Sequence, residues 1–247
     1  MSDFSSRILG SAEKHYSRIV LALDIADQSH LQKHAIDLIE KTVPYISAVK
    51  VNFHLLLPLS SDDISKINKA AHNRDLQTIA DIKLNDIGST NEAAVKILFD
   101  AGFDAVIANP FVGYDGALDA AFKVAKKTSN GIILLTYMSH PAAKDGYGLT
   151  LSSKRRVFEV FVARAIAWKA AGVVVGATSP EKIAGVRKML PKKILIFSPG
   201  IGAQGGDAKK SIKAGSDFLI VGRTIIEAED PREAARRICR ESWVPIS

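Results

Sequence analysis

Short apolar runs rich in Val and Ile recur along the chain, and most of their positions are hydrophobic without alternation. Strands buried on both faces have this continuous apolar pattern, because neither side of the sheet meets water. Eight such runs occur, and each predicts a strand: residues 18–24, 46–53, 77–83, 104–110, 131–137, 172–178, 193–199 and 217–223.

Helical patterns lie between these runs. After the third run, apolar residues recur at helical spacing between positions 94 and 101, and Gly102 is placed to end that helix. Ser89 and Glu92 predict a capping box at its start. The pairs Ser179–Pro180 and Asp230–Pro231 predict two further helix starts.

Strands that alternate with helices from residue 18 to about residue 240 predict an α/β protein, a single-domain (β/α)8 TIM barrel. A doubly wound open sheet is the alternative, but it usually has a glycine-rich turn after its first strand. Here that strand ends "LALDIADQS", without glycine. We predict a barrel catalytic domain over residues 18–247. Residues 1–17 are predicted to be an N-terminal extension, with a short helix packed outside the main fold.

Composition permits a large core and narrows the function classes. Hydrophobic residues make up 47% of the 247 positions, and the formal net charge is +7. A basic balance suits nucleic acid or a small anionic substrate. The basic residues form no long block, which disfavours nucleic acid. A basic barrel that binds RNA without catalysis is kept as an alternative, and it predicts salt-dependent binding to long polyanions.

Cysteine usage and hydropathy indicate the compartment. Cys239 is the only cysteine, so neither an internal disulfide nor a cysteine metal cluster can form. No window approaches the roughly eighteen apolar residues of a membrane span, and the N-terminus lacks the apolar core of a signal peptide. We expect a cytoplasmic protein with no membrane partner.

Polar residues gather at the carboxyl ends of the predicted strands, where the active site of a TIM barrel lies. The starts of the strands show no such convergence. The residues at the ends are Asp24, Lys50, Asn52, Asp81, Lys83, Asn109, Ser139 and Arg223.

Two neighbouring segments indicate phosphate binding. "SPGIGAQGGD", residues 198–207, follows the seventh strand, and its backbone N–H groups could line an anion site. Arg223 ends the eighth strand and can hold a phosphate bidentately. The glycines could instead serve only tight turns. The two segments follow adjacent strands, the seventh and the eighth, where TIM barrels usually bind phosphate, and this favours a phosphate site.

Three charges follow one another at the end of the third strand. Asp81 and Lys83 are two residues apart, so they project to the same face, and Asp86 follows in the loop. Lys50 on the preceding strand can reach the same space, which would give an array of alternating ammonium and carboxylate groups. A surface salt-bridge cluster is the alternative. The predicted barrel mouth favours a reaction centre.

The stretch "DIKLNDIGSTNE" resembles the D-x-K-x-x-D signature of the orotidine 5′-phosphate decarboxylase suprafamily. The segments "LALD", "VKVN", "TYMSHP", "SPGIGAQGGD" and "IVGR" occur in the expected order over residues 18 to 240. "MSHP" together with "SPGIGAQGGD" is similar to the short, archaeal-like decarboxylases of this family.

The resemblance implies decarboxylation of orotidine 5′-monophosphate to UMP in de novo pyrimidine biosynthesis, without a metal or other cofactor. It implies that Lys83 donates a proton to C6 of the pyrimidine and that Asp81 lies against the departing carboxylate. Lys50 and Asp86 would complete the charged array. A homodimer is also implied, in which Asp86 and Thr90 reach into the partner's site.

The resemblance further implies a set of substrate contacts. Ribose hydroxyls would be held by Asp24, Lys50, Asp86 and Thr90. The pyrimidine edge would be read by Ser139, and the phosphate would be held by Gln204, Gly222 and Arg223. Ile87 and Pro199 would also contact substrate, and residues 199–209 would form a closing lid.

Two Mg²⁺-dependent members of the same suprafamily are the nearest alternative. 3-Keto-L-gulonate 6-phosphate decarboxylase and hexulose-6-phosphate synthase would share Asp81, Lys83 and Asp86. They need an additional acidic ligand, and "VKVNFHLLL" offers no carboxylate near Lys50. This disfavours them.

Overall fold

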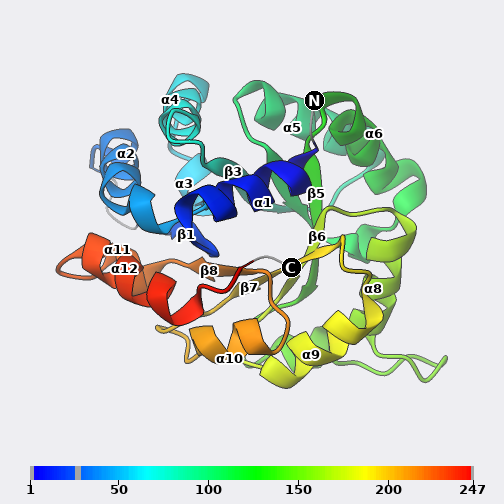
Figure 1. The fold of residues 1–247 in the computed structure, drawn as a ribbon. Coiled ribbons are helices and arrows are strands. Elements are labelled where there is room, and N and C mark those ends of the chain that lie inside the picture. The colour runs from blue at the N-terminus through cyan, green and yellow to red at the C-terminus, as the bar shows by residue number, and fades with distance from the viewer. Residues whose placement is uncertain (1–2, 26–28, 246–247) are drawn as a thin grey trace.

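Eight parallel strands close into a barrel in the order of the chain (Figure 1). The structure, a computed structural model, describes residues 3–25 and 29–245. The predicted TIM barrel is confirmed, and each predicted strand is present. The strands are β1 Ile19–Leu23, β2 Ala48–Asn52, β3 Gln77–Leu84, β4 Ala105–Ala108, β5 Gly131–Tyr137, β6 Gly172–Val175, β7 Leu195–Pro199 and β8 Phe218–Val221.

Each strand is followed by a helix of six or more residues, and these helices cover the outside of the barrel. In chain order these helices are α2 Leu31–Thr42, α4 Ser61–His72, α5 Gly88–Asp100, α6 Asp119–Thr128, α8 Val157–Ala167, α9 Pro180–Met189, α10 Ala208–Lys213 and α12 Pro231–Ser242. Shorter elements lie in the connections: α3 Phe53–Leu56, α7 Ala143–Gly146, α11 Arg223–Ile226, η1 Val43–Tyr45, η2 Pro110–Val112 and η3 Tyr114–Leu118. Helix α1, Phe4–His15, precedes the barrel.

Alternating side chains of the strands form two separate cores. One lies between the strands and the outer helices, and the other fills the barrel interior. In the interior, the rings of Phe197 and Phe218 stack with centroids 5.3 Å apart. Because the lower barrel is filled with apolar side chains, a ligand can enter only above them, at the carboxyl ends of the strands.

Helix α1 closes the opposite end of the barrel, and Figure 1 shows it lying across the strands. Its residues Phe4, Ile8 and Ala12 are buried and join the interior core. Gly131 makes room for Phe4, since a Cβ there would lie 2.6 Å from the ring. The predicted short helix is present, but its packing outside the main fold was wrong, because its apolar face completes the interior core. The division of domains at residue 17 stays a prediction, and residues 1–2 and 246–247 lie outside the described residues.

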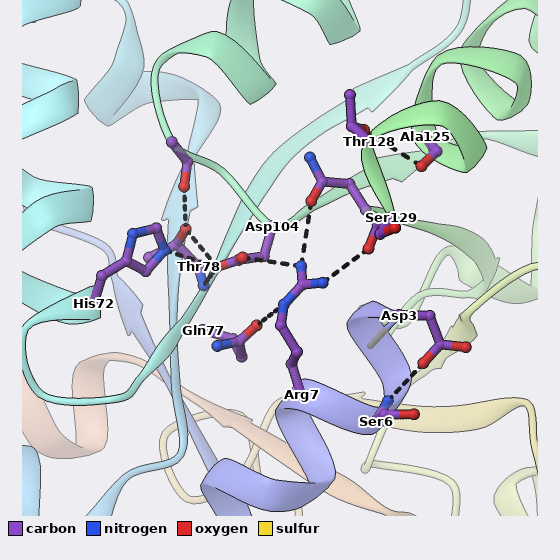
Figure 2. Close-up of polar contacts among 12 residues, drawn as sticks. Asp3, Ser6, Arg7, His72, Gln77, Thr78, Asp104, Ala125, Thr128 and Ser129 are labelled. Atoms are coloured by element: carbon purple, nitrogen blue, oxygen red, sulfur yellow. Dashed lines mark hydrogen bonds and ion pairs between the residues drawn. The ribbon is translucent and has the colours of Figure 1, made fainter. Parts of the chain in front are cut away.

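A polar cluster fixes α1 to the barrel (Figure 2). Arg7 Nη2 pairs with Asp104 Oδ1 at 3.0 Å, and Arg7 Nε donates to Gln77 Oε1 at 2.9 Å. The other Asp104 oxygen accepts from the Thr78 backbone N–H at 2.8 Å and lies 2.9 Å from His72 Nε2. The carboxylate of Asp104 thereby joins α1, α4 and the start of β3.

Two of the three predicted helix starts have the expected first residue, and the third differs. Helices α9 and α12 begin at Pro180 and Pro231, and Asp230 caps α12. The capping box of Ser89 and Glu92 was wrong. Helix α5 begins one residue before Ser89, with Ile87 in the N-cap position. Glu92 instead pairs with Lys96 at 2.5 Å.

None of the helices in the described part of the chain combines the length and apolar character needed to cross a bilayer.

Candidate functional site

A cavity of about 170 Å³ that opens to solvent lies at the carboxyl ends of the strands. Its lining comes from strands and loops all around the barrel mouth. The predicted site residues that line it are Asp24, Lys50, Asp81, Lys83, Ser139, Pro199, Gln204, Gly222 and Arg223.

Two lysines enclose one carboxylate on the cavity floor. Lys50 Nζ lies 2.9 Å from Asp81 Oδ2, and Lys83 Nζ lies 2.9 Å from Asp81 Oδ1. The side chains of Lys50 and Asp81 are 5% and 10% exposed, whereas that of Lys83 is 40% exposed. Asp81 therefore anchors both ammonium groups, and only Lys83 extends well into the accessible space.

Strand periodicity explains why these charges meet. On β2, Lys50 follows Ala48 by two residues, and on β3, Asp81 follows Ile79 by two. Ala48 and Ile79 belong to the interior core, so the charged residues point the same way, one layer higher. The register places Lys50 beside Ile79 and Asn52 beside Asp81. The array therefore stands directly on the apolar filling of the barrel.

The backbone at Lys83 is strained. Its φ is +48°, a left-handed value that non-glycine residues seldom adopt. The pairing of β3 with β4 shifts register between Ala80 and Leu84, around the same residue. Such irregularities redirect side chains at functional sites, at a cost that the surrounding fold supports. Here the irregularity belongs to the segment that aims Lys83 at Asp81.

Asp81 is held in its ionised form. Burial by itself would raise the pKa of this carboxyl group, but the charges of Lys50 and Lys83 and their hydrogen bonds outweigh it, and the pKa is lowered. The three charges carry a net charge of +1 when both lysines are protonated. The cavity floor therefore attracts an anion while presenting a carboxylate beside it.

Asp24 lies on the wall of the cavity between β2 and β8. Its Oδ1 accepts a hydrogen bond from Asn52 Nδ2. Gly222 lies against the same carboxylate, where a Cβ would collide with Asp24 Oδ2. Glycine at this position thus lets the Asp24 carboxylate approach the end of β8.

The glycine-rich segment after β7 folds into a tight loop at the cavity rim. Gly200, Gly202 and Gly205 have φ values of +99°, +70° and +89°, which favour glycine. Gln204, at the tip, has its Oε1 2.7 Å from Ser139 Oγ. This contact joins the loops after β5 and β7 across the cavity.

Arg223 lines the cavity beside this loop and is exposed. Within the described residues its guanidinium group has no ion-pair partner, so its charge is available to a ligand. Gly222 and the loop of residues 200–206 lie beside it. This corner of the cavity can hold a phosphate through the Arg223 guanidinium group.

Three predicted site residues lie elsewhere. Asp86, Ile87 and Thr90 are exposed and are not part of the cavity lining of their own chain. The Asp86 carboxylate accepts a hydrogen bond from the Ile87 N–H at 2.7 Å. These residues lie in the connection from β3 to α5 and in the first turn of α5.

Comparisons with known proteins give the family of this chain. Residues 17–238 match the model of the Orotidine 5′-phosphate decarboxylase / HUMPS family. The chain belongs to this family. It is 39% identical to the orotidine 5′-phosphate decarboxylase of Pyrococcus abyssi, over 90% of this chain and 98% of the relative. It is 37% identical to that of Thermococcus kodakarensis, over 91% and 96%.

Among solved structures, the chain is similar to a member of the family from Methanocaldococcus jannaschii. That structure is an orotidine 5′-monophosphate decarboxylase complexed with the inhibitor BMP. It has a TM-score of 0.79 and 29% identity, and the similarity covers 92% of this chain and 98% of the other. The family resemblance and the fold inferred from the sequence are thus confirmed.

Sequence reasoning missed several lining residues of this family member. Asn52 was noted at a strand end but was not assigned to the site; its position two residues after Lys50 was the available signal. The apolar lining includes Ile107, Leu135 and Val174. No signal in the sequence separates these three from the other core residues of their strands.

Among the residues that the structure describes, no group of three or more His, Cys, Asp or Glu side chains is arranged to hold a metal ion.

Proposed function

We propose that this chain decarboxylates orotidine 5′-monophosphate to UMP without a cofactor. The observation that carries the proposal is the Lys50–Asp81–Lys83 array, fixed on the apolar floor of a cavity whose rim holds Arg223 and the glycine-rich loop. Curated relatives that match nearly the whole chain are named orotidine 5′-phosphate decarboxylase, which supports the same activity.

Lys83 supplies the proton in this mechanism. The bond between C6 and the carboxylate carbon breaks, CO2 leaves, and the electron pair remains on C6. A fixed ammonium group beside C6 stabilises this developing charge and then transfers its proton to the carbon. Solvent returns a proton to the lysine. The exposure of Lys83 on the cavity side supports this role.

Asp81 acts beside the departing carboxylate. Its lowered pKa keeps it negative, so it disfavours the carboxylate of the bound substrate and favours its loss. It also fixes the ammonium groups of Lys50 and Lys83. Preorganised charges of this kind need no reorganisation during the reaction.

The remaining cavity residues each bind a different part of the substrate. Asp24 and Lys50 hold the ribose, and Ser139 reads the pyrimidine edge. Gln204, Gly222 and Arg223 hold the phosphate, and Pro199 contacts the substrate at the start of the loop. The contact between Ser139 and Gln204 supports residues 199–209 as a lid that phosphate binding closes.

We further propose that the active unit is a homodimer. Asp86, Ile87 and Thr90 would contact the substrate in the partner's cavity, since they lie outside the cavity of their own chain. Large exposed apolar side chains follow the same neighbouring strands, which supports an interface there: Phe53, Leu57, Ile87 and Phe111. A monomer would therefore be inactive.

Loss of orotidylate absorbance with the purified protein, measured with and without EDTA, tests the activity. We expect turnover that EDTA does not change. A flat trace would overturn the proposal, and EDTA-sensitive decarboxylation of 3-keto-L-gulonate 6-phosphate would instead favour the Mg²⁺-dependent members of the suprafamily.

Mixed dimers test the sharing of the site. Lys83→Ala and Asp86→Ala chains should each be inactive alone. A mixture should regain activity, because one cavity of each mixed dimer combines an intact Lys83 with the partner's intact Asp86. Absence of any regained activity would contradict the shared site.

A further inference from the structure

Asn91, in the first turn of α5, is a buried polar residue among exposed neighbours. It is 0% exposed, whereas Ser89 and Thr90 beside it are exposed. Buried amide side chains are rare unless their hydrogen bonds have a structural purpose. The N-cap residue of this helix, Ile87, makes no side-chain hydrogen bond to the helix N-terminus. The contacts of Asn91 therefore do not duplicate a side-chain cap at this end of the helix.

The Asn91 amide joins two loops of the barrel mouth. Its Nδ2 donates to the backbone oxygen of Asp86 at 2.5 Å and to that of Ala117 at 3.1 Å. The first oxygen belongs to the loop after β3, and the second belongs to η3, after β4. One side chain therefore connects the loop that carries Asp86 to the neighbouring connection.

The two loops approach each other backbone to backbone at this point. A Cβ on Gly88 would lie 3.1 Å from the Gly116 oxygen, which is closer than most real Cβ contacts. The hydrogen bonds of the Asn91 amide join the two loops beside this close contact.

The Asn91 bridge holds the backbone carbonyl group of Asp86. Within the described residues, no side chain other than Asn91 hydrogen-bonds to the Asp86 backbone. The Asp86 carboxylate accepts from the next N–H, that of Ile87, at 2.7 Å. A rotation of the peptide that Asn91 holds would therefore redirect both the Asp86 carboxylate and the Ile87 side chain.

We propose that Asn91 is a positioning residue that sets Asp86 and, through it, the active site of the partner subunit. The proposal rests on the shared-site homodimer proposed above. It predicts an unusual pattern, because a substitution buried in one chain would impair the cavity of the other chain and leave its own intact.

Asn68 provides a matched control. It is also a buried amide, 1% exposed, and its Nδ2 donates to the Ala101 backbone oxygen at 2.8 Å. The Oδ1 atoms of Asn68 and Asn91 both lack a hydrogen-bond partner among the described residues. Asn68 lies in α4, and its acceptor Ala101 follows the last residue of α5, far along that helix from Asp86.

Steady-state kinetics and thermal unfolding of Asn91→Ala and Asn68→Ala separate positioning from stability. We expect both variants to lose thermal stability. Only Asn91→Ala should lose kcat/KM, by roughly 10- to 100-fold, as expected for a misplaced group at a reaction centre. Asn91→Ser keeps a hydrogen-bond donor on a shorter side chain and replaces the alanine variant if that variant does not fold. Its kcat/KM should lie between those of the wild type and Asn91→Ala. Unchanged kinetics of a folded, dimeric Asn91 variant would overturn the proposal.

Mixed dimers then locate the defect. A 1:1 mixture of Asn91→Ala with Lys83→Ala should regain about a quarter of wild-type activity per subunit, since half of the dimers are mixed and each has one complete cavity. A mixture of Asn91→Ala with Asp86→Ala should regain nothing, because both changes affect the same half of the site.

The control mixture of Lys83→Ala with Asp86→Ala distinguishes the two proposals. If it regains activity and the Asn91→Ala mixture with Lys83→Ala does not, the role of Asn91 is wrong and the shared site stands. If neither mixture regains activity, the shared site itself is wrong, and the inference about Asn91 is overturned with it.

Discussion

Two buried aspartates lie at opposite ends of this barrel and resemble each other closely. Asp81, at the carboxyl end, is 7% exposed, and Asp104, at the amino end, is 9% exposed. Each has two basic side chains within 3.0 Å, and each has a lowered pKa. Burial, ion pairing and a perturbed pKa therefore do not by themselves distinguish a reaction centre from a structural cluster.

The partners of the two carboxylates make the difference. Asp104 also accepts from the backbone N–H of Thr78, and with Arg7 it fixes α1 across the barrel (Figure 2). Asp81 is held by side chains alone, and one of them, Lys83, has a strained backbone and extends into a cavity. A carboxylate tied to backbone donors stabilises the fold, whereas one that aims ammonium groups at an accessible cavity can act on a ligand.

The largest effect should come from the carboxyl end. Lys83→Ala removes the proton donor and one positive charge, so we expect kcat to fall by at least about 1,000-fold. UMP binding, measured by calorimetry, should persist because Arg223 and the glycine-rich loop are unchanged. Lys192→Ala is the control, since Lys192 is exposed and precedes β7 at the other end of the barrel. Near-normal turnover of Lys83→Ala would contradict the mechanism.

At the amino end the effect should be on stability. Asp104→Asn leaves Arg7 and His72 without their carboxylate, and we expect a loss of about 2 kcal/mol in the free energy of unfolding. Denaturant unfolding measures it, and kcat/KM at low temperature should remain that of the wild type. Asp75→Asn is the control. The side chain of Asp75 is 62% exposed in its pair with Lys14, so no measurable change in stability is expected. A large loss of kcat/KM in folded Asp104→Asn would contradict the proposed difference between a structural Asp104 and a catalytic Asp81.

The smallest effect should appear in the acid dependence of stability. Burial by itself would raise the pKa of Asp104, but the hydrogen bonds from His72 and the Thr78 N–H and the charge of Arg7 lower it overall. A group with a lowered folded pKa stabilises the fold above its unfolded pKa, about 3.9, and loses this contribution as pH falls through the folded value. Wild-type stability should therefore fall more steeply below about pH 4 than that of Asp104→Asn. Parallel curves from unfolding at several pH values would contradict this.

Several features of the fold and site could be predicted from local sequence because they depend on local periodicity. Eight apolar runs predict eight strands, and residue pairs at i and i+2 of a regular strand, such as Ile79 and Asp81, share a face wherever their strand lies. Polar residues at the strand ends then indicate the barrel mouth.

Other features depend on which segments meet. Gly88, the first residue of α5, packs closely against Gly116, which lies far along the chain. The exposure of Asp86 and Thr90 outside the cavity and the burial of Asn91 also follow from the packing of loops after different strands.

The amino-acid sequence by itself determined the barrel, the family and the residue types of the reaction centre. Strand periodicity is a local property, and the number of strands and the order of the motifs can be read along the chain. Only the tertiary structure decided that Asp81 lies between two lysines at a cavity while Asp104 fixes a helix. Closure of the barrel brings distant residues together, and the contacts that result, rather than the identity of the carboxylate, set what each aspartate does.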